Sequence, residues 1–290
     1  PLVLYKQKFD KVIIDQLGIQ VKNDHQNILY LKNFVKKFKN PKHDINIAIC
    51  GKYNSLHDAY KSILEAFIHA SSNNSAKINI KWIDTEKLEK EKDVSKYFSG
   101  VNGILIPGGF GNRGIEGKIL ASQYARENNI PFFGICLGMQ CAIIDYARNV
   151  WGIKDANSSE FDNKTSDPVI DIMMDQKSVT HKGGSMRLGE YSCSVSKKTK
   201  AYKSYMSDTI KERHRHRYEF NNNYLDQIKD KGLIISGLNK KLNLVEMVEL
   251  TDHPWFVGVQ FHPELKSRIM ETHPLFNSFI KSAIKHSNEA

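Results

Sequence analysis

The sequence predicts an α/β fold, in which a mostly parallel central sheet carries helices on both faces and is extended by additional strands. Between residues 45 and 148, short apolar runs alternate with segments whose apolar residues recur at helical spacing, which is typical of strands joined by helical crossovers. After residue 190, short apolar runs follow one another with little helical pattern between them. This second texture predicts the additional strands.

The individual elements follow from two patterns: short apolar runs closed by turn residues predict strands, and apolar residues every three or four positions predict helices. The expected strands are 45–50, 78–83, 103–106, 131–135, 190–195, 213–220, 233–238, 244–250 and 255–261, and the expected helices are 58–70, 115–128, 139–148 and 273–285. Proline is well tolerated at the first helical position, so Pro274 is expected to begin the last helix. In parallel sheets ligands bind at the carboxyl ends of the strands, so motifs at those ends are candidates for chemistry.

The composition excludes several classes of protein. With 40% hydrophobic residues, 12 Tyr and 14 Phe, the chain is not globally disordered, and no uninterrupted apolar run reaches the ~18 residues that a membrane helix needs. Charged side chains at Lys6, Lys8, Asp10 and Lys11 interrupt the first apolar stretch, so no signal peptide is legible. Four cysteines without a C-x-x-C pair are too few for a disulfide scaffold, and we expect a cytoplasmic protein.

The net charge of +10 is concentrated in residues 1–50 and 195–220, each of which carries +5. Cationic patches of this kind can neutralise nucleic-acid phosphates, although lysine is also the usual residue of a solvated surface. Residues 1–44 form a Lys-rich leader that ends at the turn-prone Asn40-Pro41-Lys42, and the folded domain is expected over 45–290.

The sharpest motif is Gly134-Ile135-Cys136-Leu137-Gly138, which follows an apolar strand and precedes a helical pattern. It has the spacing of a nucleophile elbow, with cysteine in place of serine. A tight strand-to-helix turn needs small flanking residues, and the helix N-terminus favours a thiolate. A buried cysteine in a glycine turn is the alternative, but the order of strand, elbow and helix favours a nucleophile.

A cysteine nucleophile needs a base, and His262 is the best placed of the 11 histidines. It follows the apolar run 255–261, and Glu264 lies two residues further on, where it can hold the imidazole in one tautomer. Backbone N–H groups of the turn Pro107-Gly108-Gly109-Phe110-Gly111, together with that of Leu137, could stabilise an oxyanion. This turn lacks the Lys-Ser/Thr of a phosphate-binding P-loop.

At this point the sequence resembles a known family. The motifs G-I-C-L-G-M-Q, P-G-G-F-G and Q-F-H-P-E resemble those of the class I (triad) glutamine amidotransferases, whose fold is flavodoxin-like. Further blocks are similar to the glutaminase domains of the CTP synthase family, namely G-K-Y, D-A-Y-K, R-G-I-E-G-K, A-N-S-S-E-F, G-G-S-M-R-L-G and E-R-H-R-H-R-Y-E. The resemblance covers roughly residues 45–285.

The resemblance implies that Cys136 attacks the γ-amide carbon of L-glutamine, releases ammonia and forms a γ-glutamyl thioester. His262, held by Glu264, would carry the protons, and Gly109 and Leu137 would supply the oxyanion hole. The positions that match the family's glutamine contacts are Gly109, Phe110, Gln140, Glu160, Arg217 and Tyr218. Glu160 and Arg217 suit an amino acid on charge alone, because Glu160 can pair with its ammonium and Arg217 with its carboxylate.

The resemblance also implies regulation by GTP, an allosteric activator in the family. The segment 183–189 matches a lid that closes over the site. The candidates for lid or effector contacts are Gly183, Gly184, Arg187, Lys52, Tyr60 and Lys61.

Finally, the resemblance implies an N-terminal amidoligase (synthetase) domain, absent from this chain, that uses ATP and Mg²⁺ to aminate UTP to CTP. Residues 1–44 would connect the two domains, and the full-length enzyme would be a homo-oligomer. No metal and no cofactor is expected for the glutaminase half-reaction, and neither nucleic acid nor a membrane is an expected partner.

Three alternatives stay open. A metal site at His214 and His216 lacks a convincing third ligand, and a nucleic-acid platform on the basic strand would leave the cysteine elbow without a role. Another Cys-His-Glu hydrolase, such as a γ-glutamyl hydrolase or the glutaminase of a different synthase, would share the elbow and the triad. Only the resemblance separates these acyl donors.

Overall fold

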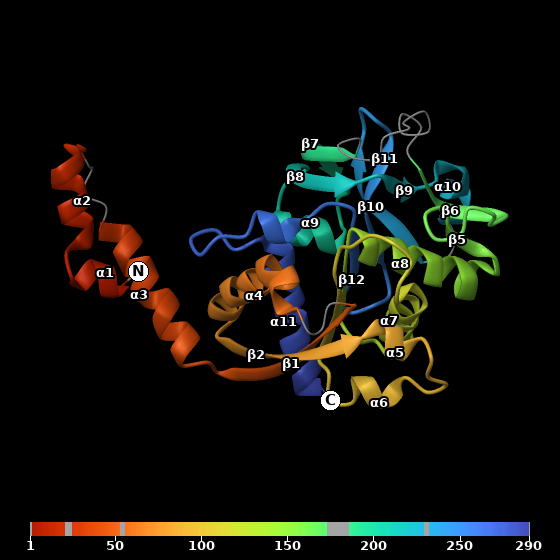
Figure 1. Ribbon diagram of the computed structural model, residues 1–290, viewed down its shortest axis with the longest axis horizontal. Coiled ribbons are helices and arrows are strands. Elements are labelled where there is room, and N and C mark those ends of the chain that lie inside the picture. The colour runs from red at the N-terminus through yellow and green to blue at the C-terminus, as the bar shows by residue number, and fades with distance from the viewer. Residues whose placement is uncertain (1, 21–24, 53–55, 173–185, 229–231, 290) are drawn as a thin grey trace.

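A nine-stranded sheet with the strand order β2-β1-β3-β4-β12-β11-β10-β7-β8 runs through the body of the protein (Figure 1). The computed structural model describes residues 2–20, 25–52, 56–172, 186–228 and 232–289. A second sheet has three strands in the order β5-β6-β9. The α/β prediction is confirmed.

One half of the large sheet is parallel. Its strands are β1 (His43–Gly51), β2 (Ala76–Asp84), β3 (Gly103–Ile106), β4 (Phe132–Ile135) and β12 (Phe256–Val259), and each pairs in parallel with its neighbours in this half. All five coincide with expected strands, and β1 begins two residues earlier than the expected 45. Their carboxyl ends form one edge, as the sequence pattern predicted.

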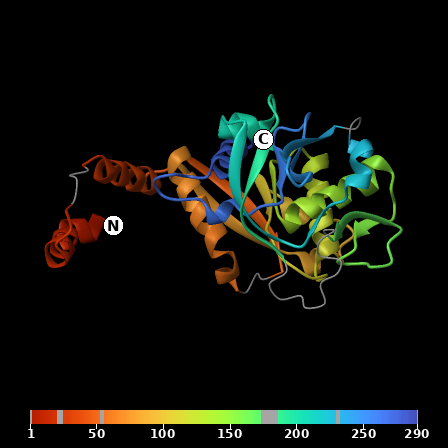
Figure 2. The ribbon, with the colours of Figure 1, turned by 90° about the horizontal axis from the view of Figure 1, so that it is seen from above.

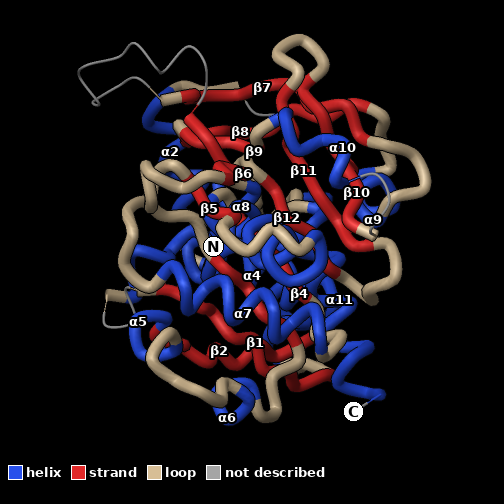
Figure 3. The backbone as a smooth tube through the Cα atoms, turned by 90° about the vertical axis from the view of Figure 1, so that its right-hand side faces the viewer, coloured by secondary structure: helices blue, strands red, loops and turns tan. Residues whose placement is uncertain are grey.

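Helices cover both faces of the parallel half (Figures 1 and 3). On one face lie α4 (Lys61–Asn74) and α11 (Pro274–Glu289), and on the other lie α7 (Ile115–Glu127) and α8 (Leu137–Tyr146). Successive strand residues point to opposite faces, so Ile104 and Ile106 pack with α7 and α8 while Leu105 packs with α4 and α11. The short helices α5 (Thr85–Leu88) and α6 (Ser95–Phe98) follow β2.

The other half of the large sheet is antiparallel and corresponds to the expected additional strands. It consists of β11 (Leu244–Leu250), β10 (Leu233–Asn239), β7 (Arg187–Val195) and β8 (Thr209–His216). The small helices here are α9 (Lys200–Tyr205) and α10 (Leu225–Ile228). Single helical turns occur at His57–Tyr60, Asn222–Tyr224 and Pro263–Leu265, and a π-helical turn at Ala147–Trp151 extends α8.

The prediction of a single strand over residues 213–220 is wrong. The chain leaves the large sheet at the end of β8, and Arg217 separates it from β9 (Tyr218–Phe220), which pairs with β6 (Asp167–Ile172) in the small sheet. The third strand of that sheet, β5 (Ala156–Ser158), was not predicted either. The alternation of residues 213–217 looks continuous in the sequence, so the change of sheet at Arg217 leaves no signal in the pattern.

The described part of the leader is helical, which the sequence analysis did not predict. Helices α1 (Leu2–Lys6), α2 (Phe9–Leu17) and α3 (His25–Lys39) project from the body of the protein (Figures 1 and 2). Helix α3 is fastened to the body by hydrogen bonds from Tyr30 Oη to the Ile269 carbonyl and from Ser72 Oγ to the Phe34 carbonyl, both 2.9 Å long. None of the helices in the described ranges is long and apolar enough to span a membrane.

Candidate active site

Cys136 lies between β4 and α8, at the carboxyl edge of the parallel strands. Its backbone has φ 51° and ψ −104°, a combination that a non-glycine residue adopts only under strain. The Cys136 N–H donates to the Val259 carbonyl at 2.6 Å, which fastens the turn to β12. This is the strained strand-to-helix turn that the sequence pattern predicted for a nucleophile.

The two glycines that flank the elbow are required by close backbone contacts. A Cβ at Gly134 would lie 2.7 Å from the carbonyl carbon of Gly138. A Cβ at Gly138 would collide with the Ile106 carbonyl oxygen of β3. The spacing of the motif therefore follows from packing: only glycine lets α8 begin this close to β3 and β4.

His262 and Glu264 follow β12, the strand that pairs with β4. His262 Nδ1 lies 2.7 Å from Glu264 Oε1, and the His262 N–H donates to the Arg213 carbonyl at 2.8 Å. A Cβ at Gly108 would lie 2.7 Å from His262 Cε1 and 3.5 Å from Cys136 Cβ, so the two side chains flank the same glycine. The three residues of the expected triad are thus brought together.

The surroundings of His262 stabilise its charged form. Burial lowers the pKa of an imidazole, but the neighbouring Cys136, followed by Glu264, outweighs burial and raises the pKa of His262 above its ordinary 6.5. An imidazolium beside a sulfur favours the thiolate, which is the nucleophilic form of cysteine.

The other cysteines have different surroundings. Cys50, Cys141 and Cys193 are fully buried, and burial raises the pKa of each thiol. In the described ranges all four cysteines are free thiols.

The glycine turn after β3 lies beside Cys136 and Leu137. A Cβ at Gly109 would come within 3.4 Å of Leu137 Cδ2, so the two residues expected to donate to an oxyanion are neighbours. Lys52 Nζ donates to the Phe110 carbonyl at 2.6 Å and so fastens the turn to the end of β1. The sequence had singled out Lys52 only as an effector candidate, whereas the structure gives it a contact with this turn.

A pocket of about 480 Å³ opens beside the turn and is lined by Phe110, Gly111, Asn112, Glu160, Met186, Arg217 and Tyr218. Glu160 Oε1 accepts the Gly111 N–H at 3.0 Å. Burial raises the pKa of Glu160, an effect that this hydrogen bond and the charges of Lys52 and Arg217 oppose. A carboxyl group and a guanidinium in one pocket suit a ligand that carries both an ammonium and a carboxylate.

Gln140 connects this pocket to the cysteine. Its Nε2 donates to the Tyr218 carbonyl at 2.9 Å and to Gln260 Oε1 at 3.2 Å, and Gln260 Nε2 in turn lies 3.7 Å from Cys136 Sγ. Gln260 was not among the expected site residues. Its signal in the sequence was an amide inside the apolar run 255–261, two residues before His262, and the structure shows that this amide is fully buried.

The remaining sequence candidates lie in other places. Tyr60 is buried and stacks on Trp82 at a centroid distance of 5.7 Å, whereas Lys61 is exposed and pairs with Glu65. Arg187 is buried at the start of β7 and pairs with Glu246 at 2.8 Å. Gly183 and Gly184 lie outside the described residues. The effector roles of these residues stay predictions.

The basic strand β8 separates its charges by face. Lys211, Arg213 and Arg215 are exposed, whereas His214 and His216 are buried and 3.1 Å apart. Among the residues that the structure describes, no group of three or more His, Cys, Asp or Glu side chains could hold a metal ion.

Comparisons with known proteins show the family of the chain. The family model described as "Glutamine amidotransferase class-I" matches residues 55–282. The chain is 52% identical over 284 residues to a CTP synthase of Caldanaerobacter subterraneus and 53% identical over 283 residues to a CTP synthase of Cytophaga hutchinsonii. Each match covers 98% of this chain and 52% of the relative, so the chain spans about half the length of the curated relatives it matches.

A solved structure is similar as well. The glutaminase domain of Trypanosoma brucei CTPS, with bound acivicin, is 39% identical and superposes with a TM-score of 0.77. The superposition covers 83% of this chain and 94% of that domain.

Proposed function

This chain belongs to the class-I glutamine amidotransferase family, and from that premise we propose that it hydrolyses L-glutamine to glutamate and ammonia through a thioester on Cys136. The observation that carries the proposal is the strained cysteine at the start of α8, beside an imidazole that is held by a carboxylate at 2.7 Å. A strained, small-flanked cysteine with an oriented base is the arrangement of covalent acyl transfer.

In the proposed reaction Cys136 Sγ bonds to the γ-carbonyl carbon of glutamine, and the carbonyl oxygen takes the negative charge. The N–H groups of Gly109 and Leu137 would donate to that oxygen, at a place where a fixed donor is worth about 3 to 4 kcal/mol in other hydrolases. His262 then gives a proton to the amide nitrogen, the C–N bond breaks, and ammonia leaves.

The second half of the reaction reverses these roles. His262 takes a proton from water, the hydroxide adds to the thioester carbonyl, and the C–S bond breaks to release glutamate and the thiolate. Glu264 would hold the Nδ1 proton throughout, which leaves Nε2 free to exchange protons with the reacting atoms.

Recognition of glutamine would use the pocket beside Phe110. Glu160 would pair with the α-ammonium and Arg217 with the α-carboxylate, while Gln140 and Tyr218 complete the wall next to the cysteine. This assignment explains why a carboxyl group and a guanidinium share a pocket of only about 480 Å³.

The whole protein to which this chain corresponds would be a CTP synthase. Its synthetase domain would use ATP, Mg²⁺ and the ammonia made here to aminate UTP, in a homo-oligomer, and residues 1–44 would connect the two domains. The relatives that support this are named CTP synthases and are about twice as long as the chain.

GTP would act as an activator at the face that carries exposed basic side chains. Lys211, Arg213 and Arg215 line the exposed face of β8, and Arg215 lies over the Phe110 ring with its guanidinium carbon 5.9 Å from the ring centroid. Such a face favours a polyanionic effector next to the pocket.

The test measures glutamate released from L-glutamine by the chain, with and without GTP, and compares Cys136→Ala with Cys193→Ala. We expect Cys136→Ala to abolish release, and Cys193→Ala, which removes a buried thiol in β7, to retain it. Release that survives Cys136→Ala would contradict the mechanism. Transfer from γ-glutamyl peptides in preference to glutamine would support a γ-glutamyl hydrolase instead.

A further inference from the structure

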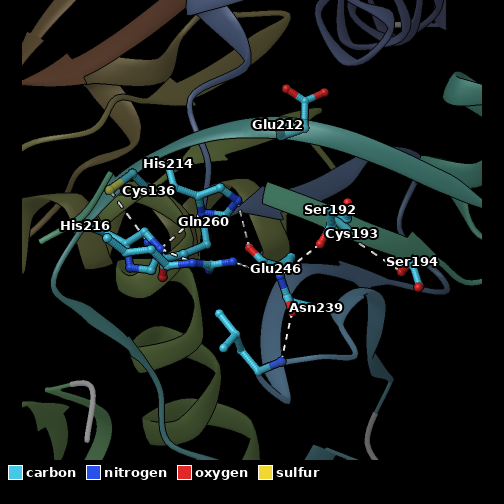
Figure 4. Close-up of polar contacts among 12 residues, drawn as sticks. Cys136, Ser192, Cys193, Ser194, Glu212, His214, His216, Asn239, Glu246 and Gln260 are labelled. Carbon is cyan, nitrogen blue, oxygen red and sulfur yellow. Dashed lines mark hydrogen bonds and ion pairs between the residues drawn. The ribbon is translucent and has the colours of Figure 1, made fainter. Parts of the chain in front are cut away.

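A cluster of buried charged and titratable side chains lies behind the site, between β7, β8 and β11. Glu246 is fully buried, with Oε1 2.8 Å from an Arg187 guanidinium nitrogen and Oε2 3.2 Å from His214 Nε2. Figure 4 shows Glu246, His214 and His216 beside Gln260 and Cys136. The reaction described above uses none of Glu246, Arg187, His214 and His216, yet buried ionisable groups are costly unless they are paired.

The hydrogen bonds of the two histidines fix where their protons are. His216 Nδ1 lies 3.1 Å from the Tyr218 carbonyl, and because a carbonyl only accepts, Nδ1 carries the proton. His216 Nε2 is then the acceptor, and it receives His214 Nδ1–H at 3.1 Å and an Arg187 N–H at 3.4 Å. A proton on both nitrogens of His216 would put a second cation against Arg187.

This order leaves His214 Nε2 without a proton of its own, 3.2 Å from Glu246 Oε2. A bare nitrogen against an ionised carboxylate is repulsive in a dry site, so the pair requires one proton, although its two atoms stand at ion-pair distance and not in hydrogen-bond geometry. Two acceptors that share a buried position in this way must take up a proton, as paired carboxylates do.

The ionisation of the cluster agrees with that proton count. Burial, which the nearby Arg187 opposes, raises the pKa of Glu246 from 4.5 to about 7. Burial and then Arg187 lower the pKa of His214 to about 2 and that of His216 to about 3. Within the described ranges, the other titratable groups that face the cluster are Tyr191 and Cys193 from β7 and His262 after β12.

The cluster ends at the corner that carries the glutamine contacts. The Tyr218 carbonyl that accepts from His216 also accepts from Gln140 at 2.9 Å. Arg217 and Tyr218, the residues of this corner between β8 and β9, line the pocket. Loss of this proton would favour the other tautomer of each histidine. His214 would carry its proton on Nε2, toward Glu246, and His216 would carry its proton on Nε2, toward His214. The hydrogen bond from His216 Nδ1 to the Tyr218 carbonyl would then be lost.

We propose that Glu246 and His214 are positioning residues, which hold one proton between them and thereby keep the His216 N–H directed at the Tyr218 carbonyl, so that Arg217 and Tyr218 face the bound glutamine. The inference rests on the proposed glutaminase function for its effect on the substrate, but not for the position of the proton. This inference gives a structural role to His214 and His216, the buried histidine pair of β8.

The first test compares KM and kcat of glutamate release across a pH range that spans about 7. In the wild type, KM for glutamine rises as pH passes through this value, because the carboxyl loses the shared proton. Glu246→Gln keeps a permanent amide N–H toward His214, so its KM stays within about threefold of the protonated wild type and shows no such step. Glu246→Leu offers no donor, and its KM is raised about tenfold or more with a smaller change in kcat.

Glu249→Gln is the matched control, since Glu249 is a buried carboxylate on the same strand that accepts from the Lys200 and Ala201 N–H groups away from the pocket. We expect it to lower thermal stability without changing KM. A Glu246→Leu variant with wild-type KM, or a Glu246→Gln variant that retains the wild-type step, would overturn the proposal.

The second test needs no activity. In the chain labelled with ¹⁵N-histidine, His214 and His216 should be neutral with the proton on Nδ1 below about pH 7, and should shift toward Nε2–H above it. In Glu246→Gln both should remain Nδ1–H at every pH. A His216 that carries its proton on Nε2 at low pH refutes the inference, whereas a chain with these tautomers but no glutamate release contradicts only the proposed function.

Discussion

His262 Nδ1 and Glu264 Oε1 are 2.7 Å apart, and both side chains are largely buried, at 13% and 9% exposure. A carboxylate only accepts, so Glu264 fixes the proton on Nδ1 and leaves Nε2 toward the cysteine. Glu264→Ala should therefore lower kcat for glutamate release by about 10²- to 10⁴-fold, the usual contribution of an oriented acid and base.

The same variant should change the pH profile in a defined direction. Because Glu264 contributes to the raised pKa of His262, its removal lowers that pKa, and the alkaline limb of kcat moves to lower pH. Glu271→Ala, at an exposed carboxylate nearby in the chain, serves as the control. An alkaline limb that stays in place would show that Glu264 does not act on His262.

Substitution of Arg217 should raise KM for glutamine more than substitution of the neighbouring arginines of the basic strand. Arg217→Gln removes a cation from the pocket and should raise KM for glutamine by about 30-fold or more, because loss of one partner of a desolvated charge pair costs about 2 to 5 kcal/mol. Arg213→Gln, at an exposed position in β8, should leave KM unchanged in the absence of GTP. Equal KM values for the two variants would remove Arg217 from the binding site. Steady-state rates at varied glutamine concentrations decide this.

Lys52 should act on the reaction through the turn that it fastens. Lys52→Met removes the 2.6 Å hydrogen bond to the Phe110 carbonyl, and the loss of a charged hydrogen bond should lower kcat/KM by about tenfold or more. Lys61→Met is the matched variant, since Lys61 is exposed and pairs across one helical turn with Glu65. If Lys52→Met loses activity only when GTP is present, Lys52 belongs to effector binding instead.

His253 should make the fold sensitive to acid. It is buried, with Nε2 3.1 Å from the Ala125 carbonyl and Nδ1 accepting the Trp255 N–H at 3.2 Å, so neither nitrogen has room for another proton. Burial, together with its charged neighbours, lowers the pKa of His253 to about 4 from 6.5. A depressed pKa leaves the unfolded state with more bound protons, and stability falls as pH drops from about 6.5 to about 4, by about 3 kcal/mol in total.

The check is the free energy of unfolding in urea as a function of pH. His253→Gln should flatten its decline between these two pH values, whereas His43→Gln, at a partly exposed position, should leave the decline as it is. An unchanged pH dependence in His253→Gln would mean that other groups cause the acid sensitivity.

Much of the parallel half could be predicted because its signals are local. Each strand there is a short apolar run, and Cys136 and His262 each follow such a run at the carboxyl edge of the sheet. The turn after β3 could be placed beside Cys136 for the same reason, since β3 and β4 are neighbours. Cys136, His262 and this turn share the dependence on the nearest strand, whereas Glu160 and Arg217 were expected from the family resemblance and their charge.

The features that could not be predicted depend on contacts between distant segments. Glu246 meets Arg187 and His214 only because β11, β7 and β8 belong to one antiparallel half, and nothing in the run 244–250 says what its glutamates face. The leader was not predicted to be helical although its apolar residues recur at helical spacing in α2 and α3, and its helices leave apolar side chains such as Val12 and Leu17 exposed.

The environments of the four cysteines make the chain selective toward electrophiles. Cys50, Cys141 and Cys193 have no exposed surface, and burial keeps them in the unreactive thiol form. Cys136 is also largely buried, but it alone among them has His262 at its side and connects through Gln260 and Gln140 to Tyr218, which lines the pocket. A haloacetamide or chloroketone probe of amino-acid size should thus mark one residue of the folded chain, and its yield would report the fraction of molecules whose elbow is correctly formed.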